Sequence, residues 1–165
     1  MKILFTGGGT GGHIFPIIAI IRELKKISKT KIDFFYIGPS DDFAPVFLSQ
    51  EDVKVKLIFC GKIRRYITPL SIIQNFVDFF KIPIGFFQAF FHIFFLNPDL
   101  IFSKGGFGSI PVVLSGWILR VPIFLHESDS IPGLANRFLS KFALEIFVSF
   151  PNTLYFPQKK TVLVG

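Results

Sequence analysis

Residues 2–13 read KILFTGGGTGGH, a short apolar run that leads directly into five glycines within six residues. The apolar run has the composition and the glycine boundary of a buried strand. Residues 14 to about 28 follow with a helical pattern, and Pro16 is tolerated in the first turn of such a helix. Glycines let a backbone approach a ligand, and a helix amino terminus offers free N–H groups to an anion. The stretch therefore predicts a strand, a loop and a helix that together bind a diphosphate, in preference to a tight turn without a ligand.

Apolar strands and helices alternate along the rest of the chain. This alternation predicts an α/β fold, a Rossmann-like doubly wound sheet whose strands are mostly parallel. Ligands of such sheets bind beyond the carboxyl ends of the strands. The expected strands are 2–6, 32–37, 53–59, 100–103, 123–125 and 146–150, with 161–164 as a further candidate. The expected helices are 14–28, 69–96 with a kink or break at Pro83, 109–119 and 133–142.

The composition narrows the class of protein. The 165 residues suit one domain, and half of them are hydrophobic, which is ample for a core. Phenylalanine occurs 24 times, more aromatic surface than a small globule buries, and the net charge is +7. Without a dense basic run, this charge favours phosphate groups and a membrane surface over nucleic acid. A lone cysteine, Cys60, excludes an internal disulfide, and neither a signal peptide nor a membrane span is expected.

A second glycine loop, KGGFGS at residues 104–109, follows the predicted strand 100–103. It repeats the order of strand, glycine turn and helix start found at residues 2–13. Two such loops at neighbouring strand ends are expected to bracket a diphosphate between two helix dipoles. Ser109 is either the N-cap of the next helix or a ligand contact.

A third cluster, HESD at residues 126–129, follows the predicted strand 123–125. Transfer of a group to a hydroxyl needs a base that takes the hydroxyl proton, and the candidates are His13, Glu127 and Asp129. For Asp129 the alternative is a turn or cap residue. For His126 a buried, hydrogen-bonded core histidine is favoured over catalysis. Asn136 contacts either a ligand or the preceding loop.

Two other site types are less well supported. Gly7, Gly9 and Gly12 match the spacing of a dinucleotide-binding loop. That fold needs an acid at the end of the second strand, whereas Asp33 lies at the beginning of strand 32–37. No His/Cys/Asp cluster has the spacing of metal ligands, so we predict neither a bound metal nor a cofactor.

Residues 70–96 are almost entirely apolar apart from one narrow polar stripe at helical spacing. A helix that packs one face on a sheet cannot bury so wide an apolar arc. The rest of the arc is expected to meet a membrane surface, with Arg64 and Arg65 just upstream near anionic head groups. The alternative is a helix buried on all sides within a larger assembly.

Several motifs together resemble the MurG-like transferases of glycosyltransferase family 28, and their order and spacing match through nearly the whole chain. The resemblance implies a GT-B fold of two Rossmann-like domains, of which residues 1–165 are the amino-terminal, acceptor-binding domain. It further implies inverting transfer of N-acetylglucosamine from UDP-N-acetylglucosamine to a lipid-diphosphate-linked muramoyl-pentapeptide, a step of peptidoglycan synthesis. The matching stretches are 8–16, 105–107, 116–122, 126–127, 132–137 and 150–151.

The resemblance also implies roles for individual residues. The glycine loops face the acceptor diphosphate, residues 10–12 touch the donor, and His13 matches a histidine needed for activity. The family acts as a peripheral protein on the cytoplasmic face of the membrane. The implied substrate contacts are Thr10, Gly11, Gly12, Gly105, Gly106, Phe107, Ser109 and Asn136. The implied membrane patch is Phe76, Phe79, Phe80 and Trp117, with Arg64 and Arg65.

Two departures from the family pattern affect these expectations. Ser128 and Asp129 replace a Gln-Asn pair on the donor side, so either the donor contacts differ or Asp129 is the base. The donor-binding domain, which makes most contacts with UDP-N-acetylglucosamine, is not in these residues, so we expect the isolated chain to be inactive. The chain is then a piece of a full transferase, a membrane-associated half that pairs with a separate donor-binding chain, or a non-catalytic binder of lipid diphosphates.

Overall fold

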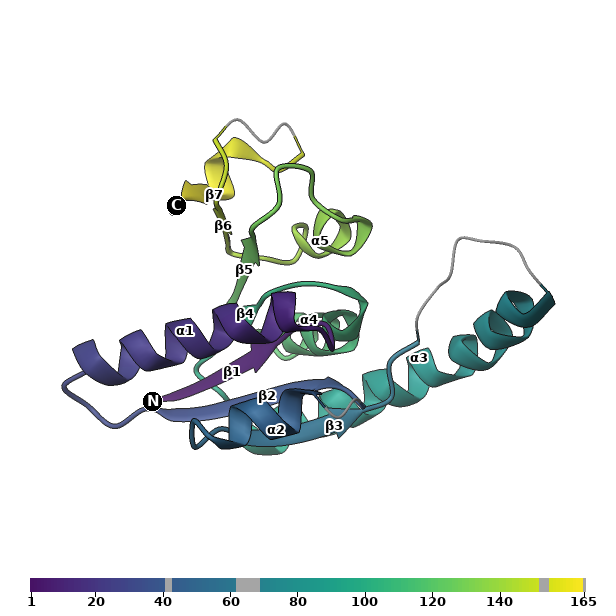
Figure 1. Cartoon of the computed structure of the whole chain (residues 1–165), viewed down its shortest axis with the longest axis horizontal. Coiled ribbons are helices and arrows are strands. Elements are labelled where there is room, and N and C mark those ends of the chain that lie inside the picture. The colour runs from purple at the N-terminus through teal and green to yellow at the C-terminus, as the bar shows by residue number, and fades with distance from the viewer. Residues whose placement is uncertain (41–42, 62–68, 152–154, 165) are drawn as a thin grey trace.

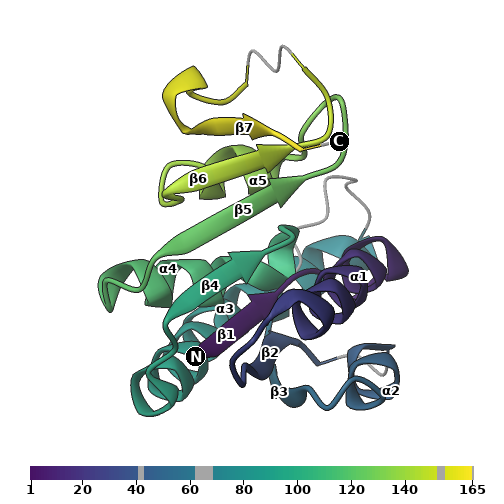
Figure 2. The same ribbon diagram turned by 90° about the vertical axis from the view of Figure 1, so that its left-hand side faces the viewer.

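The computed structural model describes residues 1–40, 43–61, 69–151 and 155–164, with residues 69–79 described by their backbone alone. Its centre is a seven-stranded sheet in the order β3-β2-β1-β4-β5-β6-β7, with every neighbouring pair parallel (Figure 2). This confirms the predicted doubly wound fold. The strands are β1 (Lys2–Thr6), β2 (Asp33–Pro39), β3 (Lys54–Ile58), β4 (Leu100–Ser103), β5 (Ile123–Glu127), β6 (Glu145–Val148) and β7 (Thr161–Leu163).

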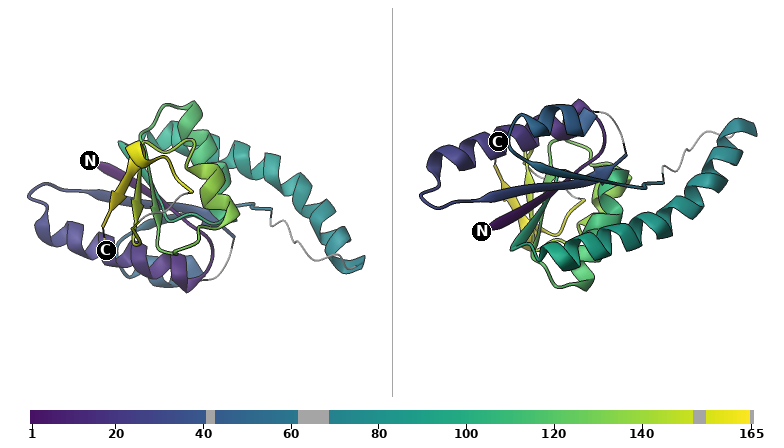
Figure 3. Two further views of the ribbon diagram at one scale, coloured as in Figure 1. Left: turned by 90° about the horizontal axis from the view of Figure 1, so that it is seen from above. Right: turned by 90° about the horizontal axis from the view of Figure 1, so that it is seen from below.

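Helices cover both faces of the sheet (Figures 1 and 3). One face carries α1 (Gly11–Ile27) and α2 (Phe43–Ser49). The other carries α3 (Pro69–Leu96), α4 (Ile110–Ile118) and α5 (Leu134–Leu139). The first half of α3 projects away from the sheet (Figure 1). Short 3₁₀ turns, η1 (Phe107–Ser109) and η2 (Gln158–Lys160), precede α4 and β7.

The two cores follow from the alternation of side chains along the strands. In β1, Leu4 points into the core beneath α3 and α4, whereas Phe5 points into the core beneath α1. Both side chains are completely buried. Because a strand buried on both faces needs apolar residues at every position, β1 is a continuous apolar run rather than an alternating one.

The strand order reverses direction between β1 and β4. Thr6 at the end of β1 pairs with Ser103 at the end of β4, and the Lys104 amide donates to the Thr6 carbonyl at 2.8 Å. Consequently the loops after these two strands lie side by side at the carboxyl edge of the sheet. This is the position at which doubly wound folds bind their ligands.

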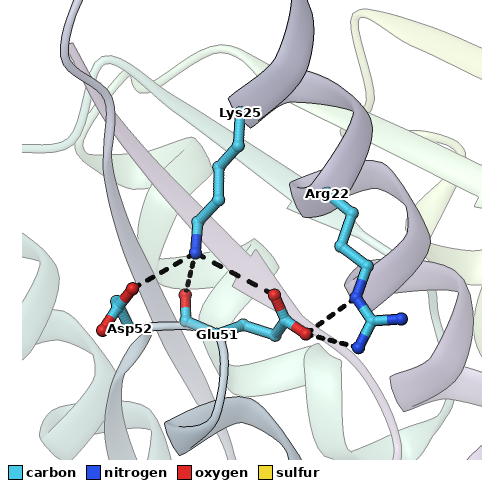
Figure 4. A network of polar contacts seen from close by, with 4 residues as sticks. All are labelled: Arg22, Lys25, Glu51 and Asp52. Carbon is cyan, nitrogen blue, oxygen red and sulfur yellow. Dashed lines mark hydrogen bonds and ion pairs between the residues drawn. The ribbon is translucent and has the colours of Figure 1, made fainter.

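A polar network ties α1 to the turn that joins α2 and β3 (Figure 4). The Arg22 guanidinium donates through Nε to Glu51 Oε1 at 2.7 Å, and Lys25 Nζ donates to the Glu51 carbonyl at 2.8 Å. Lys25 also lies 3.4 Å from the Asp52 carboxylate. The network holds the second half of α1, far from the glycine loop that precedes the helix.

Besides shifts of one to three residues at other element ends, such as α1, which begins at Gly11 instead of residue 14, four differences from the sequence-based expectations stand out. The helix α2 was not predicted, because its seven residues, FAPVFLS, have a proline near the start and no polar face. The helix α3 is continuous through Pro83 instead of split. The helix expected at 109–119 begins with the 3₁₀ turn η1, and α5 ends at Leu139 instead of residue 142. Within the described residues, none of the helices combines the length and apolar character needed to cross a membrane.

Candidate functional site

A cavity of about 330 Å³ opens at the carboxyl edge of the sheet. Three segments form it: the first turn of α1, the loop after β4, and the stretch from the end of β5 to the first turn of α5. These are the three constellations that the sequence singled out, so the structure brings them together. The lining residues are Gly12, His13, Lys104, Gly106, Phe107, Glu127, Ser128, Asp129, Gly133, Leu134, Ala135 and Asn136.

His13 lies in the first turn of α1, between the two glycine loops. A Cβ atom added to Gly106 would lie 2.9 Å from His13 Nε2, and one added to Gly8 would lie 3.0 Å from the same ring. The imidazole therefore fills space that only glycines leave open. His13 also lines a second cavity of about 370 Å³, which includes Cys60 and Gly61. The ring is shared by both cavities.

The surroundings of His13 favour its neutral form. Burial lowers the pKa of the imidazole below 6.5, the positive charge of Lys104 lowers it further, and Asp129 opposes this shift. Thr10 Oγ1 lies 2.8 Å from Nδ1. In the tautomer in which Nδ1–H donates to Thr10, Nε2 has a free lone pair. His13 is then able to accept a proton at neutral pH.

The start of α1 retains free amide donors. The Thr10 carbonyl accepts hydrogen bonds from the amides of His13 and Ile14, and the Thr10 side chain does not cap the helix. The first amides of a helix have no intrahelical acceptor, which leaves Gly11 and Gly12 available to an anion. The diphosphate contact at this loop stays a prediction.

In the loop after β4, the amides of the two glycines that were expected to face a diphosphate form hydrogen bonds within the protein. Gly105 and Gly106 have φ angles of +86° and +83°. The Gly105 amide donates to Ser103 Oγ at 3.1 Å, and the Gly106 amide donates to Asn136 Oδ1 at 3.2 Å. Because both amides are already engaged, this loop forms a fixed wall of the cavity and offers no amide of either glycine to a phosphate.

Ser109 was expected to be an N-cap or a ligand contact, and it occupies the N-cap position of α4 without capping the helix through its side chain. Its side chain is fully buried, makes no capping hydrogen bond, and donates through Oγ to the Gly106 carbonyl at 2.7 Å. Ser109 therefore stabilises the loop from behind the cavity.

Glu127 and Asn136 connect the loop after β4 to the segment between β5 and α5. Glu127 is buried, and its Oε1 accepts the Asp129 amide while its Oε2 accepts Asn136 Nδ2, both at 2.9 Å. Both oxygens are thus occupied, and the arrangement suits a positioning residue better than a base. Asn136 contacts the preceding loops, which was one of its two expected roles. The exposed side chain of Asp129 remains open to the cavity.

His126 is half-buried and does not match the expected hydrogen-bonded core histidine. Its Nδ1 is buried and has no hydrogen-bond partner among the described residues. Burial and the nearby charge of Lys104 lower the pKa of His126 to about 4. The ring packs beside Phe102, with centroids 6.2 Å apart. It is therefore neutral at physiological pH.

Lys104 is the site residue that sequence reasoning missed, although it belongs to the second glycine motif. Its position directly after β4, at the strand end where ligands bind, was the available signal. The side chain is only 4 % exposed, and Nζ donates to Ser128 Oγ at 2.9 Å. Burial lowers the pKa of Lys104, whereas Glu127 and Asp129 raise it.

Large apolar side chains are exposed on α3 and on α4, and these two helices pack against each other. We call this surface the aromatic face. Of the expected membrane patch, Phe80 and Trp117 are exposed on it. The side chains of Phe76 and Phe79, and the whole of Arg64 and Arg65, lie outside the described residues. The aromatic face consists of Phe80, Ile84, Phe87, Phe91, Phe94, Phe95, Trp117 and Ile118.

Comparisons with known proteins identify a family and several relatives of this chain. The model of the glycosyltransferase family 28 N-terminal domain matches residues 3–148. A Bacillus thuringiensis protein named UDP-N-acetylglucosamine–N-acetylmuramyl-(pentapeptide) pyrophosphoryl-undecaprenol N-acetylglucosamine transferase 3 is 43 % identical over 99 % of this chain and 45 % of its own length. A Borrelia turicatae transferase of the same name, without the number, is 42 % identical over 99 % of the chain and 44 % of its own length. The chain thus spans about half the length of the curated relatives it matches.

Solved structures share the fold. MurG from Acinetobacter baumannii superposes with a TM-score of 0.76 at 24 % identity, over 98 % of this chain and 43 % of that one. A UDP-GlcNAc 2-epimerase from Neisseria meningitidis, bound to UDP-GlcNAc, superposes with a TM-score of 0.68 at 14 % identity, over 100 % of this chain and 47 % of that one. Because the family model covers residues 3–148, the chain belongs to glycosyltransferase family 28, whose N-terminal domain it contains.

Proposed function

We propose that this chain supplies the acceptor-binding half of an inverting transferase that moves N-acetylglucosamine from UDP-N-acetylglucosamine to a lipid-diphosphate-linked muramoyl-pentapeptide. The observation that carries the proposal is His13, a neutral imidazole next to the free amides of α1 and shared by two cavities. The names of the relatives that match almost the whole chain support the choice of substrates.

Each residue of the site has a separate role in the proposed transfer. His13 Nε2 takes the proton of the acceptor hydroxyl as its oxygen attacks the anomeric carbon of the sugar. The bond from that carbon to the UDP oxygen breaks, and UDP leaves with the electron pair. The amides of Gly11 and Gly12 stabilise diphosphate charge. Asp129 is the alternative base, and its negative charge also favours the imidazolium that forms on His13.

A chimeric protein, which we call the graft, tests this function. Residues 1–165 replace the matching residues of the Bacillus thuringiensis transferase, which retains the rest of its own chain. We expect the graft to transfer radiolabelled N-acetylglucosamine to the lipid-linked muramoyl-pentapeptide, because the acceptor half supplies the base and the anion-binding loop. The unaltered Bacillus protein is the positive control. A graft that folds and binds UDP-N-acetylglucosamine but transfers nothing contradicts the proposal and favours a non-catalytic binder.

We further propose that the aromatic face rests on the cytoplasmic surface of the membrane. Phe80, Phe87 and Phe91 follow one another at helical spacing and are each more than half exposed. Arg120 and Lys141 line a hollow beside Trp117, where they suit anionic head groups. Apolar area and cationic charge in one region are the two features of interfacial binding.

Vesicle binding tests the membrane contact. Replacing Phe87, Phe91 and Trp117 together with serine is expected to weaken binding to phosphatidylglycerol vesicles at least tenfold, because burial of each aromatic side chain contributes about 1.5–3 kcal/mol. Co-sedimentation measures the effect. Ile27→Ser is the matched control, since Ile27 is exposed at the far end of α1. Unchanged binding of the triple variant would exclude this surface.

A further inference from the structure

Lys104 combines burial with a charge for which the described residues provide little direct compensation. Its side chain is 4 % exposed, and its one hydrogen bond among the described residues goes to the neutral hydroxyl of Ser128. Glu127 and Asp129 act on it through space, and neither carboxylate forms an ion pair with Nζ within the 4.0 Å limit. A buried ammonium is costly unless it is paired, so this one is poised for an anion.

The position of Lys104 indicates which anion. Lys104 lines the cavity together with Gly12 and His13, which lie at the start of α1. A Cβ atom on Gly7 would lie 3.2 Å from His13 Cβ and 3.5 Å from Lys104 Cβ, so both side chains leave the backbone beside the first glycine loop. The amides of that loop and the ammonium of Lys104 therefore act on the same small volume, where a diphosphate suits both.

We propose that Lys104 is the anion-binding cation of this site, and that its ammonium turns from Ser128 to the diphosphate of the ligand held at the start of α1. The inference rests on the proposed function, which supplies a diphosphate-bearing ligand. In the free site Lys104 repels a proton from His13. A bound diphosphate offsets that charge, so the basicity of His13 rises when the ligand arrives. Substrate binding thereby prepares the base.

Calorimetric titration of the chain with inorganic pyrophosphate tests the binding role. Lys104→Met is expected to weaken binding about 10- to 100-fold, the effect of removing one charge-assisted hydrogen bond. Lys104→Arg keeps the charge and is expected to retain most of the affinity. Lys29→Met removes the same charge beyond the other end of α1, about 25 Å away, and is expected to bind as the unaltered chain does. Equal affinity of Lys104→Met and the unaltered chain overturns the proposal.

A second variant separates ligand binding from a structural role of the Lys104–Ser128 pair. Ser128→Ala removes the resting partner of the ammonium, so pyrophosphate is expected to bind as well or more tightly. Weaker binding of Ser128→Ala would mean that the hydrogen bond merely holds the loop. Nuclear magnetic resonance of the His13 ring adds a readout that a structural role does not move. Pyrophosphate, or Lys104→Met without ligand, should raise the pKa of His13.

Two further arms identify the source of the diphosphate. Farnesyl diphosphate stands for the lipid acceptor and UDP for the donor, and the ligand that loses more affinity in Lys104→Met is the one that Lys104 binds.

Failure of the proposed function and failure of the proposed role of Lys104 give different results. A graft that transfers no sugar while Lys104→Met still loses pyrophosphate contradicts the function alone, whereas transfer with unaltered pyrophosphate binding contradicts the role of Lys104 alone.

Discussion

Replacing His13 with glutamine in the graft is expected to lower kcat about 100- to 10,000-fold, the usual contribution of a general base. Glutamine keeps a polar side chain between the glycine loops but cannot accept the proton. Because the pKa of His13 is lowered in the free site, kcat/KM of the unaltered graft should be maintained below pH 6.5 and fall as the pH drops through the pKa of the ring. Initial rates of sugar transfer as a function of pH measure both effects.

Two variants complete this experiment. His92→Gln makes the same change on α3, outside both cavities at His13, and should leave transfer unchanged. Asp129→Asn removes a charge that raises the pKa of His13, so its acidic limb should move to lower pH. If His13→Gln keeps a near-normal rate while Asp129→Asn is inactive, the base is Asp129.

Replacing Gly105 with alanine is expected to lower the free energy of unfolding by about 3 kcal/mol. The φ of +86° costs a side chain about 1–2 kcal/mol. The new Cβ atom also occupies the position of Asn136 Oδ1, so the Asn136 side chain must move. It then loses the hydrogen bond that Oδ1 accepts from the Gly106 amide and the one that Nδ2 donates to Glu127, worth about 1 kcal/mol each. For a chain of this size the melting temperature should fall by about 6–12 °C, as calorimetry measures.

Gly133→Ala is the matched control for this stability measurement. Gly133 has a φ of −65°, which any residue adopts, and a Cβ atom there meets nothing within 4 Å. Its melting temperature should equal or slightly exceed that of the unaltered chain. Equal stability of the two alanine variants would show that the positive φ and the contact with Asn136 do not constrain the loop.

The sequence was most informative where one local rule decides the structure. β1 and β4 have the predicted bounds, because an apolar run that ends at a glycine loop has few alternatives. The three loops of the site were also predicted to meet, since parallel strands end at one edge. The helix α2 was missed because its short apolar segment lacks a periodic pattern, and tertiary packing on α1 stabilises it.

The roles within the site were harder to predict, because they depend on which groups are already paired. Nothing in the glycine spacing shows that the Gly105 and Gly106 amides are occupied by Ser103 and Asn136. Glu127 is a plausible base by residue type, and only its two hydrogen bonds indicate a positioning role. Lys104 was overlooked because a lysine after a strand is usually solvated, whereas here three loops enclose it.

The bridge from Gly106 through Asn136 to Glu127 has a consequence for how acceptors are distinguished. It joins the loops after β4 and β5 into one rigid wall of the cavity. This wall cannot change its conformation for a different ligand without breaking buried hydrogen bonds. Under the proposed function, a rigid wall makes selection among related lipid-linked sugars depend on how well each one fits the preformed site. Variants with broader acceptor use should arise by loosening this bridge, at the expense of thermal stability.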